Sequence, residues 1–221
     1  VDVADLKEKA KANAASLAFV ESAEKLQLPR NEDFNGARQD GFGLYQVTQY
    51  LGERWSAARA YIAPLKDRAN LNVRTNTLVE KLRIENGRAT GVVIREQGRS
   101  VTLSAKGAVI LSGGAFGSPQ TLLLSGIGPA QHLRDKGIDV VLDKAAVGAD
   151  LQDHCDYIIG FDADDKNLMG GSLAGLAHMA RDIWRYMRDR SGPMTTPFAE
   201  SGGFVKIRSD APAPDIQYHF I

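Results

Sequence analysis

The sequence predicts an α/β region followed by an α+β region. Residues 70–106 alternate like the strands of a β-meander, and residues 107–129 (GAVILSGGAFGSPQTLLLSGIGP) have the pattern of a strand, a glycine turn and a helix. Residues 156–221 combine one amphipathic helix with strand-like segments, which is typical of an antiparallel sheet covered by a helix. We therefore expect three segments: a lead-in of helix, loop and helix at 1–66, the meander and strand–turn–helix unit at 67–155, and a different fold at 156–221.

The composition excludes several classes of protein. The chain has 221 residues, of which 43% are hydrophobic and 24% charged, as in ordinary globular proteins. Lys+Arg and Asp+Glu both number 27, so no net charge favours nucleic acid. No apolar run approaches the roughly 20 residues of a membrane span, and no signal peptide is recognised at the start. One cysteine, Cys155, excludes an internal disulfide. We expect a cytoplasmic protein; membrane association and homo-oligomerisation stay open.

The sequence of the lead-in segment, 1–66, predicts two helices separated by a loop. Apolar residues recur at helical spacing over 17–26, and 54–65 is rich in helix formers. Between them, 31–53 is dominated by turn formers, and Gly41-Phe42-Gly43 follows no predicted strand, so a loop with two glycines is expected. Arg59, on the second helix, is expected to make a structural ion pair or hydrogen bond.

The meander predicts antiparallel strands joined by tight turns. Asn86-Gly87 is a strong hairpin signal between two alternating segments. The expected strands lie at 72–75, 78–84, 89–96 and 100–104.

The strand–turn–helix unit is the most informative stretch. Residues 108–111 predict a strand buried on both faces. Ser118 is a good N-cap, Pro119 suits the first helical position, and Gly126 suits a left-handed C-terminal cap. A strand leading through a glycine turn into a helix N-terminus can bring backbone N–H groups to a phosphate or nucleotide. The spacing lacks G-x-G-x-x-G, so a tight turn that binds nothing is an equally good interpretation.

The rest of the chain carries no catalytic pattern of its own. Asp153-His154-Cys155 are adjacent residues that cannot converge on one metal ion, and Ser118 lacks the G-x-S-x-G setting of a nucleophile. Neither a metal site nor a hydrolytic set is expected. The remaining predicted elements are helices at 130–136 and 172–190 and strands at 138–142, 157–161, 200–206 and 214–220.

Several blocks of residues together resemble a known family. Residues 114–120 (GAFGSPQ) and 122–128 (LLLSGIG) form the longest block. Four more occur at 33–36 (DFNG), 41–46 (GFGLYQ), 54–61 (RWSAARAY) and 150–154 (DLQDH). In this order they resemble the glucose–methanol–choline (GMC) oxidoreductases, which are FAD-dependent alcohol oxidases and dehydrogenases. Thr121 departs from the family's usual aliphatic residue but keeps a branched shape. Within the family, 198–204 (FAESGGF) and 215–220 (DIQYHF) are most similar to choline dehydrogenases.

The resemblance implies a cofactor, a fold and site residues. It implies part of an FAD-binding domain of the two-dinucleotide-fold type at 67–155, then part of an antiparallel-sheet substrate domain. Val79 would contact the adenine of FAD, Gly114 and Ala115 would form part of the FAD cradle, and Glu200 would face the quaternary ammonium of a choline-like substrate. The alternatives are that Val79 is a plain core valine and Glu200 a structural acid paired in the sheet. No metal is implied.

The resemblance also implies an activity. It is the FAD-dependent oxidation of a primary alcohol, choline-like or another small alcohol, to an aldehyde by hydride transfer to flavin. The family's G-x-G-x-x-G lies upstream of the matched region and its catalytic His downstream, so we expect an internal fragment without a catalytic residue, inactive alone. The alternatives are a lyase of the same fold with non-redox FAD, and a truncated binding module without flavin chemistry. The electron acceptor is not predicted.

Overall fold

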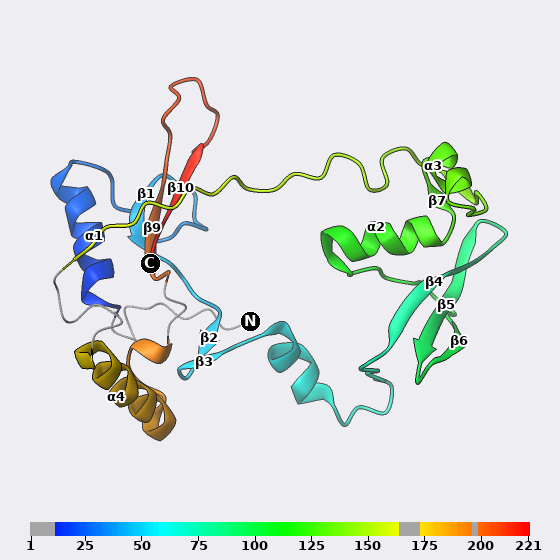
Figure 1. Ribbon diagram of the computed structural model, residues 1–221, viewed down its shortest axis with the longest axis horizontal. Coiled ribbons are helices and arrows are strands. Elements are labelled where there is room, and N and C mark those ends of the chain that lie inside the picture. Colours follow the sequence, from blue (N-terminus) through cyan, green and yellow to red (C-terminus); the bar gives the residue numbers. More distant parts are fainter. Residues whose placement is uncertain (1–11, 164–172, 196–198) are drawn as a thin grey trace. The chain divides into compact units, whose positions relative to one another are not determined.

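The chain divides into two compact units, which Figure 1 shows in colours that follow the sequence. The computed structural model describes residues 12–163, 173–195 and 199–221. Unit 1 comprises the residues up to Leu71 and those from Gly160 onward, and unit 2 is Asn72–Ile159. The beginning and the end of the chain therefore belong to one unit, and the middle forms the other.

Unit 1 is built on a three-stranded antiparallel sheet. Its order is β1 (Gly41–Leu44), β9 (Ser201–Val205) and β10 (Ile216–Phe220), with β9 in the centre. The expected pairing of the last two strands is confirmed. Helix α1 (Ala14–Lys25) packs against β1 and β9, with the predicted apolar spacing placing Val20 and Ala23 in the core.

The middle of β9 is made of glycine because aromatic side chains lie directly on it. A Cβ on Gly202 would collide with the Tyr218 carbonyl oxygen and the Tyr45 hydroxyl, and one on Gly203 would lie 2.6 Å from the Phe42 ring. The Tyr45 hydroxyl donates a hydrogen bond to the Tyr218 carbonyl oxygen at 2.5 Å. Aromatic rings thus supply the packing that a glycine strand lacks.

The prediction of a loop throughout 31–53 is wrong. Gly41, Phe42 and Gly43 form β1, and two short strands follow, β2 (Gln49–Tyr50) and β3 (Glu53–Arg54). The partner of β1 lies about 160 residues further along the chain, a pairing that local propensity does not report. Gly43 is required by close approach, since a Cβ there would collide with the carbonyl oxygen of Asn31.

The second predicted helix is shorter and less regular than expected. Residues 54–65 contain a π-helical turn, η1 (Ala58–Ile62), and a 3-10 turn, η2 (Ala63–Leu65). Pro64 lies inside the second turn, where its missing N–H interrupts the α-helical hydrogen-bond ladder. The predicted role of Arg59 is confirmed: it pairs with Glu53, and its guanidinium lies 5.0 Å from the centre of the Trp55 ring.

The last part of unit 1 contains helix α4 (Leu173–Asp189), as predicted, and a 3-10 turn, η3 (Pro193–Thr195). Arg190, which follows α4, pairs with Glu53 at 3.1 Å. Glu53 therefore joins two arginines from distant parts of the sequence. The expected boundary at Ser172 lies outside the described residues.

Unit 2 begins with the predicted meander. Strands β4 (Leu78–Glu85), β5 (Arg88–Glu96) and β6 (Arg99–Ser104) pair antiparallel in that order. Asn86 and Gly87 have φ values of 50° and 74°, which confirms the predicted hairpin turn. Leu82 and Ile94 are buried, and helix α2 (Gly114–Leu124) packs on β4.

A small parallel pair completes unit 2. Strand β7 (Ile127–Gly128) pairs with β8 (Leu142–Asp143), and helix α3 (Ala130–Asp135) connects them. Leu133 on α3 is fully buried. Helix α3 confirms the prediction, whereas the strand expected at 138–142 is reduced to its last residue and Asp143.

Three predicted strands do not form. Residues 72–75, 108–111 and 157–161 are irregular, and Ile110 and Ile158 are 84% and 91% exposed. A strand exists only when its backbone groups pair with a neighbouring strand. No strand in the described residues lies alongside these segments, so their apolar, β-branched composition is not sufficient.

Helix α2 starts earlier than predicted. Its N-cap is Gly113 rather than Ser118, and Pro119 lies inside the helix. The Ser118 hydroxyl accepts a hydrogen bond from the Gly113 N–H at 2.9 Å, so it closes the glycine turn from within the helix. Gly126 has the predicted left-handed conformation, with φ of 81°.

The glycine requirement in β9 is testable in the full-length protein that contains this chain. Gly202→Ala should lower the free energy of unfolding by about 3 kcal/mol, the upper range for overpacking, because the new methyl displaces Tyr45 and Tyr218. Gly98→Ala is the control: Gly98 has φ of 78° but nothing within 4 Å of an added Cβ. Strain alone should cost about 1–2 kcal/mol there. Equal losses in chemical denaturation would contradict the steric argument.

Candidate functional site

Val79 lies in β4, the strand on which α2 packs. It pairs with Ile94 and is 39% exposed, so it is neither a fully buried core residue nor a free surface residue. The register shifts between Val79 and Lys81, which places a β-bulge at Glu80. Bulges bend the strand and change the direction of neighbouring backbone groups.

Gly114 and Ala115 form the start of α2. Gly114 has φ of 79°, a conformation that glycine adopts without strain, and an added Cβ would meet no atom within 4 Å. Ala115 and Phe116 are exposed, the latter by 77%. The first N–H groups of an α-helix have no partner inside the helix. The start of α2 is therefore open and offers hydrogen-bond donors to a ligand.

Ser125 joins the two elements that carry these residues. The Ser125 hydroxyl accepts a hydrogen bond from the Leu82 N–H at 2.8 Å and donates one to the Thr121 carbonyl oxygen at 2.5 Å. Both Leu82 and Ser125 are buried. The structure thus brings β4, with Val79, against α2, with Gly114 and Ala115. The sequence analysis placed Ser125 in a motif but assigned it no contact.

Glu200 lies in unit 1 and is buried, with 2% of its surface exposed. Its carboxylate accepts a hydrogen bond from the Asn13 N–H at 2.5 Å, and its backbone carbonyl accepts one from the Tyr45 N–H at 2.8 Å. Asn13 is the N-cap of α1, where its side chain accepts from the Ala15 N–H. A carboxylate at a helix N-terminus is electrostatically favourable. The sequence analysis missed Asn13, and nothing in its spacing indicates a partner 187 residues away.

Aromatic side chains gather on the same sheet. The Tyr45 ring contacts the Phe34 and His219 rings, with ring centres 5.2 and 5.4 Å away, and meets Phe204 edge-on at 6.5 Å. Burial raises the pKa of the Tyr45 hydroxyl, so it stays protonated at neutral pH. His219 is one of the rings in this cluster.

The Asp153-His154-Cys155 stretch makes no site. Asp153 accepts a hydrogen bond from the backbone N–H of His154, and Cys155 is exposed. Within the ranges that the structure describes, no group of three His, Cys, Asp or Glu side chains could hold a metal ion.

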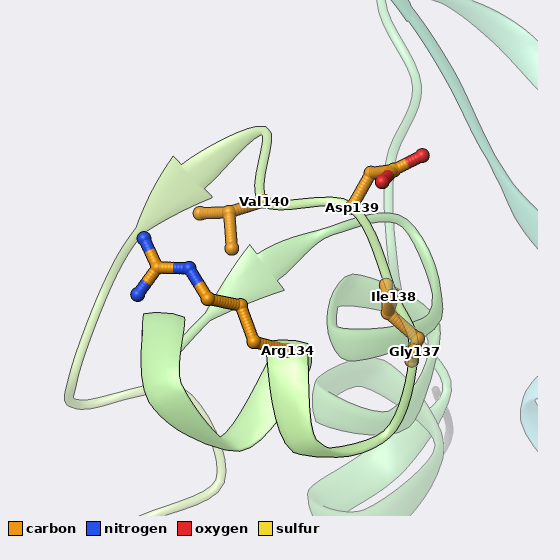
Figure 2. Close-up of a pocket in the computed structure, with 5 residues that line it drawn as sticks. All are labelled: Arg134, Gly137, Ile138, Asp139 and Val140. Carbon is orange, nitrogen blue, oxygen red and sulfur yellow. The ribbon is translucent and has the colours of Figure 1, made fainter.

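A shallow pocket lies at the end of α3, as Figure 2 shows. It is lined by Arg134, Gly137, Ile138, Asp139 and Val140 and encloses about 330 Å³. The Asp139 carboxylate points away from the Arg134 guanidinium in Figure 2. Because its polar groups do not converge, this pocket lacks the arrangement of a binding site.

Comparison with known proteins places these features in a family. Residues 3–156 match the family model described as GMC oxidoreductase. This chain belongs to the GMC oxidoreductase family. An alcohol dehydrogenase [acceptor] of Pseudomonas putida is 38% identical over 221 residues, covering 99% of this chain and 40% of that protein. An oxygen-dependent choline dehydrogenase of Rhizobium rhizogenes is 40% identical over 207 residues, covering 92% and 37%.

A solved structure agrees with this assignment. A formate oxidase of Aspergillus oryzae, studied for the modification of its FAD, is 27% identical with a TM-score of 0.72. The match covers 90% of this chain and 35% of that protein. The predicted fold class is confirmed, and FAD is indicated as the cofactor of the GMC family members. This chain spans about 40% of the length of the relatives it matches. No helix in the described ranges has the length and apolar character to cross a membrane.

The contact between Glu200 and Asn13 is testable by stability. Glu200→Ala should lower the free energy of unfolding by about 1–3 kcal/mol, because it leaves the partly buried Asn13 N–H without its acceptor. Glu200→Gln should lose less, since its amide oxygen still accepts this bond. Glu21→Ala, at an exposed position of α1, is the control for loss of a carboxylate. Identical stability of the two Glu200 variants would contradict the capping role.

Proposed function

We propose that this chain is part of an FAD-dependent enzyme that oxidises a primary alcohol to an aldehyde by hydride transfer to the flavin. The observation that carries the proposal is the open start of α2, a helix that packs on β4, in a member of the GMC oxidoreductase family. The relatives named as alcohol and choline dehydrogenases support an alcohol as the substrate class.

The residues of unit 2 fit the proposed cofactor. Gly114 leaves open space at the helix start, and the free N–H groups of the first turn favour a negatively charged ligand such as the FAD pyrophosphate. Val79 lies on the strand that α2 packs against and is accessible enough for a backbone contact with adenine. We therefore assign Val79, Gly114 and Ala115 to FAD binding, and segment 67–155 to the FAD-binding domain.

Glu200 is proposed as a substrate contact. Its buried carboxylate, on a sheet rich in aromatic rings, has the charge that attracts a quaternary ammonium group. The hydrogen bond from the Asn13 N–H would hold this carboxylate in a fixed orientation. This assignment makes a choline-like alcohol the preferred substrate and segment 156–221 part of the substrate domain.

The chemistry follows from these assignments. Bound FAD would supply the hydride acceptor. The residues of this chain would bind and orient: the start of α2 the cofactor, and Glu200 the cationic end of the substrate. We assign the removal of the hydroxyl proton to a base elsewhere in the protein.

FAD reduction tests the activity in the full-length protein that contains this chain. Under anaerobic conditions, choline should bleach the visible absorption of the oxidised flavin, because hydride transfer reduces it. A neutral primary alcohol should be tested in parallel. Bound FAD that no alcohol bleaches would overturn the oxidation and favour a lyase. A full-length protein without FAD would overturn the flavoenzyme assignment itself.

The FAD assignment of Gly114 can be tested against a matched glycine. Gly114→Asn should reduce bound FAD by about tenfold, equivalent to roughly 1.4 kcal/mol, because the new side chain occupies the open start of α2. Gly98→Asn is the control, since Gly98 has φ of 78° and equally open surroundings but lies in the β5–β6 turn. The measurement is the ratio of flavin to protein absorbance after purification. Equal loss in both variants would indicate backbone strain rather than cofactor contact.

The substrate assignment of Glu200 predicts a selective defect. Glu200→Gln should raise KM for choline about tenfold, the effect of losing roughly 1.4 kcal/mol of binding, and leave KM for a neutral primary alcohol nearly unchanged. The amide still caps α1, so the structural contact is retained. Steady-state kinetics with both substrates give the answer. A similar rise for both would mean that Glu200 acts only through the structure.

A further inference from the structure

We propose that Ser125 is a positioning residue that sets the separation between the two FAD-contacting elements of unit 2. This inference rests on the proposed FAD function, because it concerns where Val79 and Gly114 stand relative to each other. It assigns a role that neither the motif nor the family match provides.

The first step concerns the outer edge of the meander. β4 is an edge strand of the sheet, since β5 is its one strand partner within the described part of the chain. In an antiparallel pair, successive N–H groups point alternately toward the partner strand and away from it. The Leu82 N–H is directed to Ser125 at 2.8 Å. A buried edge N–H without a partner would cost about 1–3 kcal/mol.

The second step concerns the end of α2. Ser125 is the C-cap residue of α2, and its hydroxyl donates to the Thr121 carbonyl oxygen one turn earlier. The same hydroxyl therefore uses its donor on the helix and its acceptor on the strand. One side chain fixes both the end of α2 and its place along β4.

The third step is geometric. Val79 lies three residues before Leu82, about 10 Å along the strand at 3.3 Å per residue. Gly114 lies eleven residues before Ser125, about 16 Å along the helix at 1.5 Å per residue. The two residues proposed to contact FAD therefore both lie some distance from the hydrogen bonds of Ser125. One is on β4 and the other is on α2. A small shift or tilt of α2 at Ser125 moves Gly114 by a larger distance, and this changes the space available to FAD between the two elements.

Other residues at position 125 would not make the same two hydrogen bonds as serine in the same space. Alanine removes both hydrogen bonds and leaves the Leu82 N–H unsatisfied. Threonine keeps the hydroxyl and adds a methyl group, and cysteine keeps the size but is a weaker acceptor. Thr121 offers a matched control on the same helix. Within the described residues, its hydroxyl donates to the Gly117 carbonyl oxygen at 2.8 Å and makes no hydrogen bond to β4.

The experiment measures FAD and ADP binding to the full-length protein after removal of its flavin. Ser125→Ala should raise the Kd for FAD about tenfold and the Kd for ADP by a similar factor, because adenine and pyrophosphate no longer meet both elements in register. Ser125→Thr should restore binding to within about twofold, and Thr121→Val should leave it unchanged. The visible circular dichroism of bound flavin should change in Ser125→Ala, which a loss of stability alone would not cause. All binding is measured well below each variant's unfolding transition.

The outcomes are distinct. Wild-type protein that binds neither FAD nor ADP would overturn the proposed function, and this inference with it. Wild-type protein that binds FAD, together with Ser125→Ala of equal Kd, would overturn the inference and leave the function standing. If Ser125→Ala does not fold, Ser125→Cys replaces it, with an expected Kd between those of wild type and a tenfold loss; a wild-type Kd for Ser125→Cys would then overturn the inference.

Discussion

Both units depend on one constraint: the backbone N–H and C=O groups of their short strands must find hydrogen-bond partners. In unit 2 the edge of β4 is closed by a side chain, Ser125, rather than by another strand. In unit 1 the central strand β9 has partners on both sides, and its glycines leave room for Tyr45 and Phe42. Where no such partner exists among the described residues, as at 108–111, apolar composition does not produce a strand.

The sequence predicts best what is local. The Asn86-Gly87 hairpin, the three strands of the meander and helix α4 each follow from a pattern of fewer than twenty residues. The prediction fails where the deciding partner is distant. β1 resembles a glycine-rich loop because its partner β9 lies in another part of the sequence, and α2 begins at Gly114 because Ser118 turns back to the Gly113 N–H. The resemblance to GMC oxidoreductases indicated the family without supplying these contacts.

The same distinction applies to the candidate site. The glycine turn before α2 is visible in the sequence as a possible ligand-binding turn, but the equally good alternative was a turn that binds nothing. The structure adds that Gly114 faces open space and that its helix is held beside the strand of Val79. The hydrogen bond between Ser125 and β4 could not be predicted from the sequence. A serine after an apolar helix can make several kinds of contact, and only its distance to Leu82 shows which one it makes.

The structural and functional interpretations of Glu200 are compatible rather than opposed. An ionised carboxylate offers about four acceptor positions, and the Asn13 N–H occupies one of them. That bond fixes the orientation of the side chain before any ligand arrives, which lowers the ordering cost of binding. A carboxylate that is 2% exposed also stands in a weakly screened environment, where its attraction for a cation is stronger than at the surface. The bond that stabilises α1 would therefore strengthen, not replace, the proposed contact with a cationic alcohol.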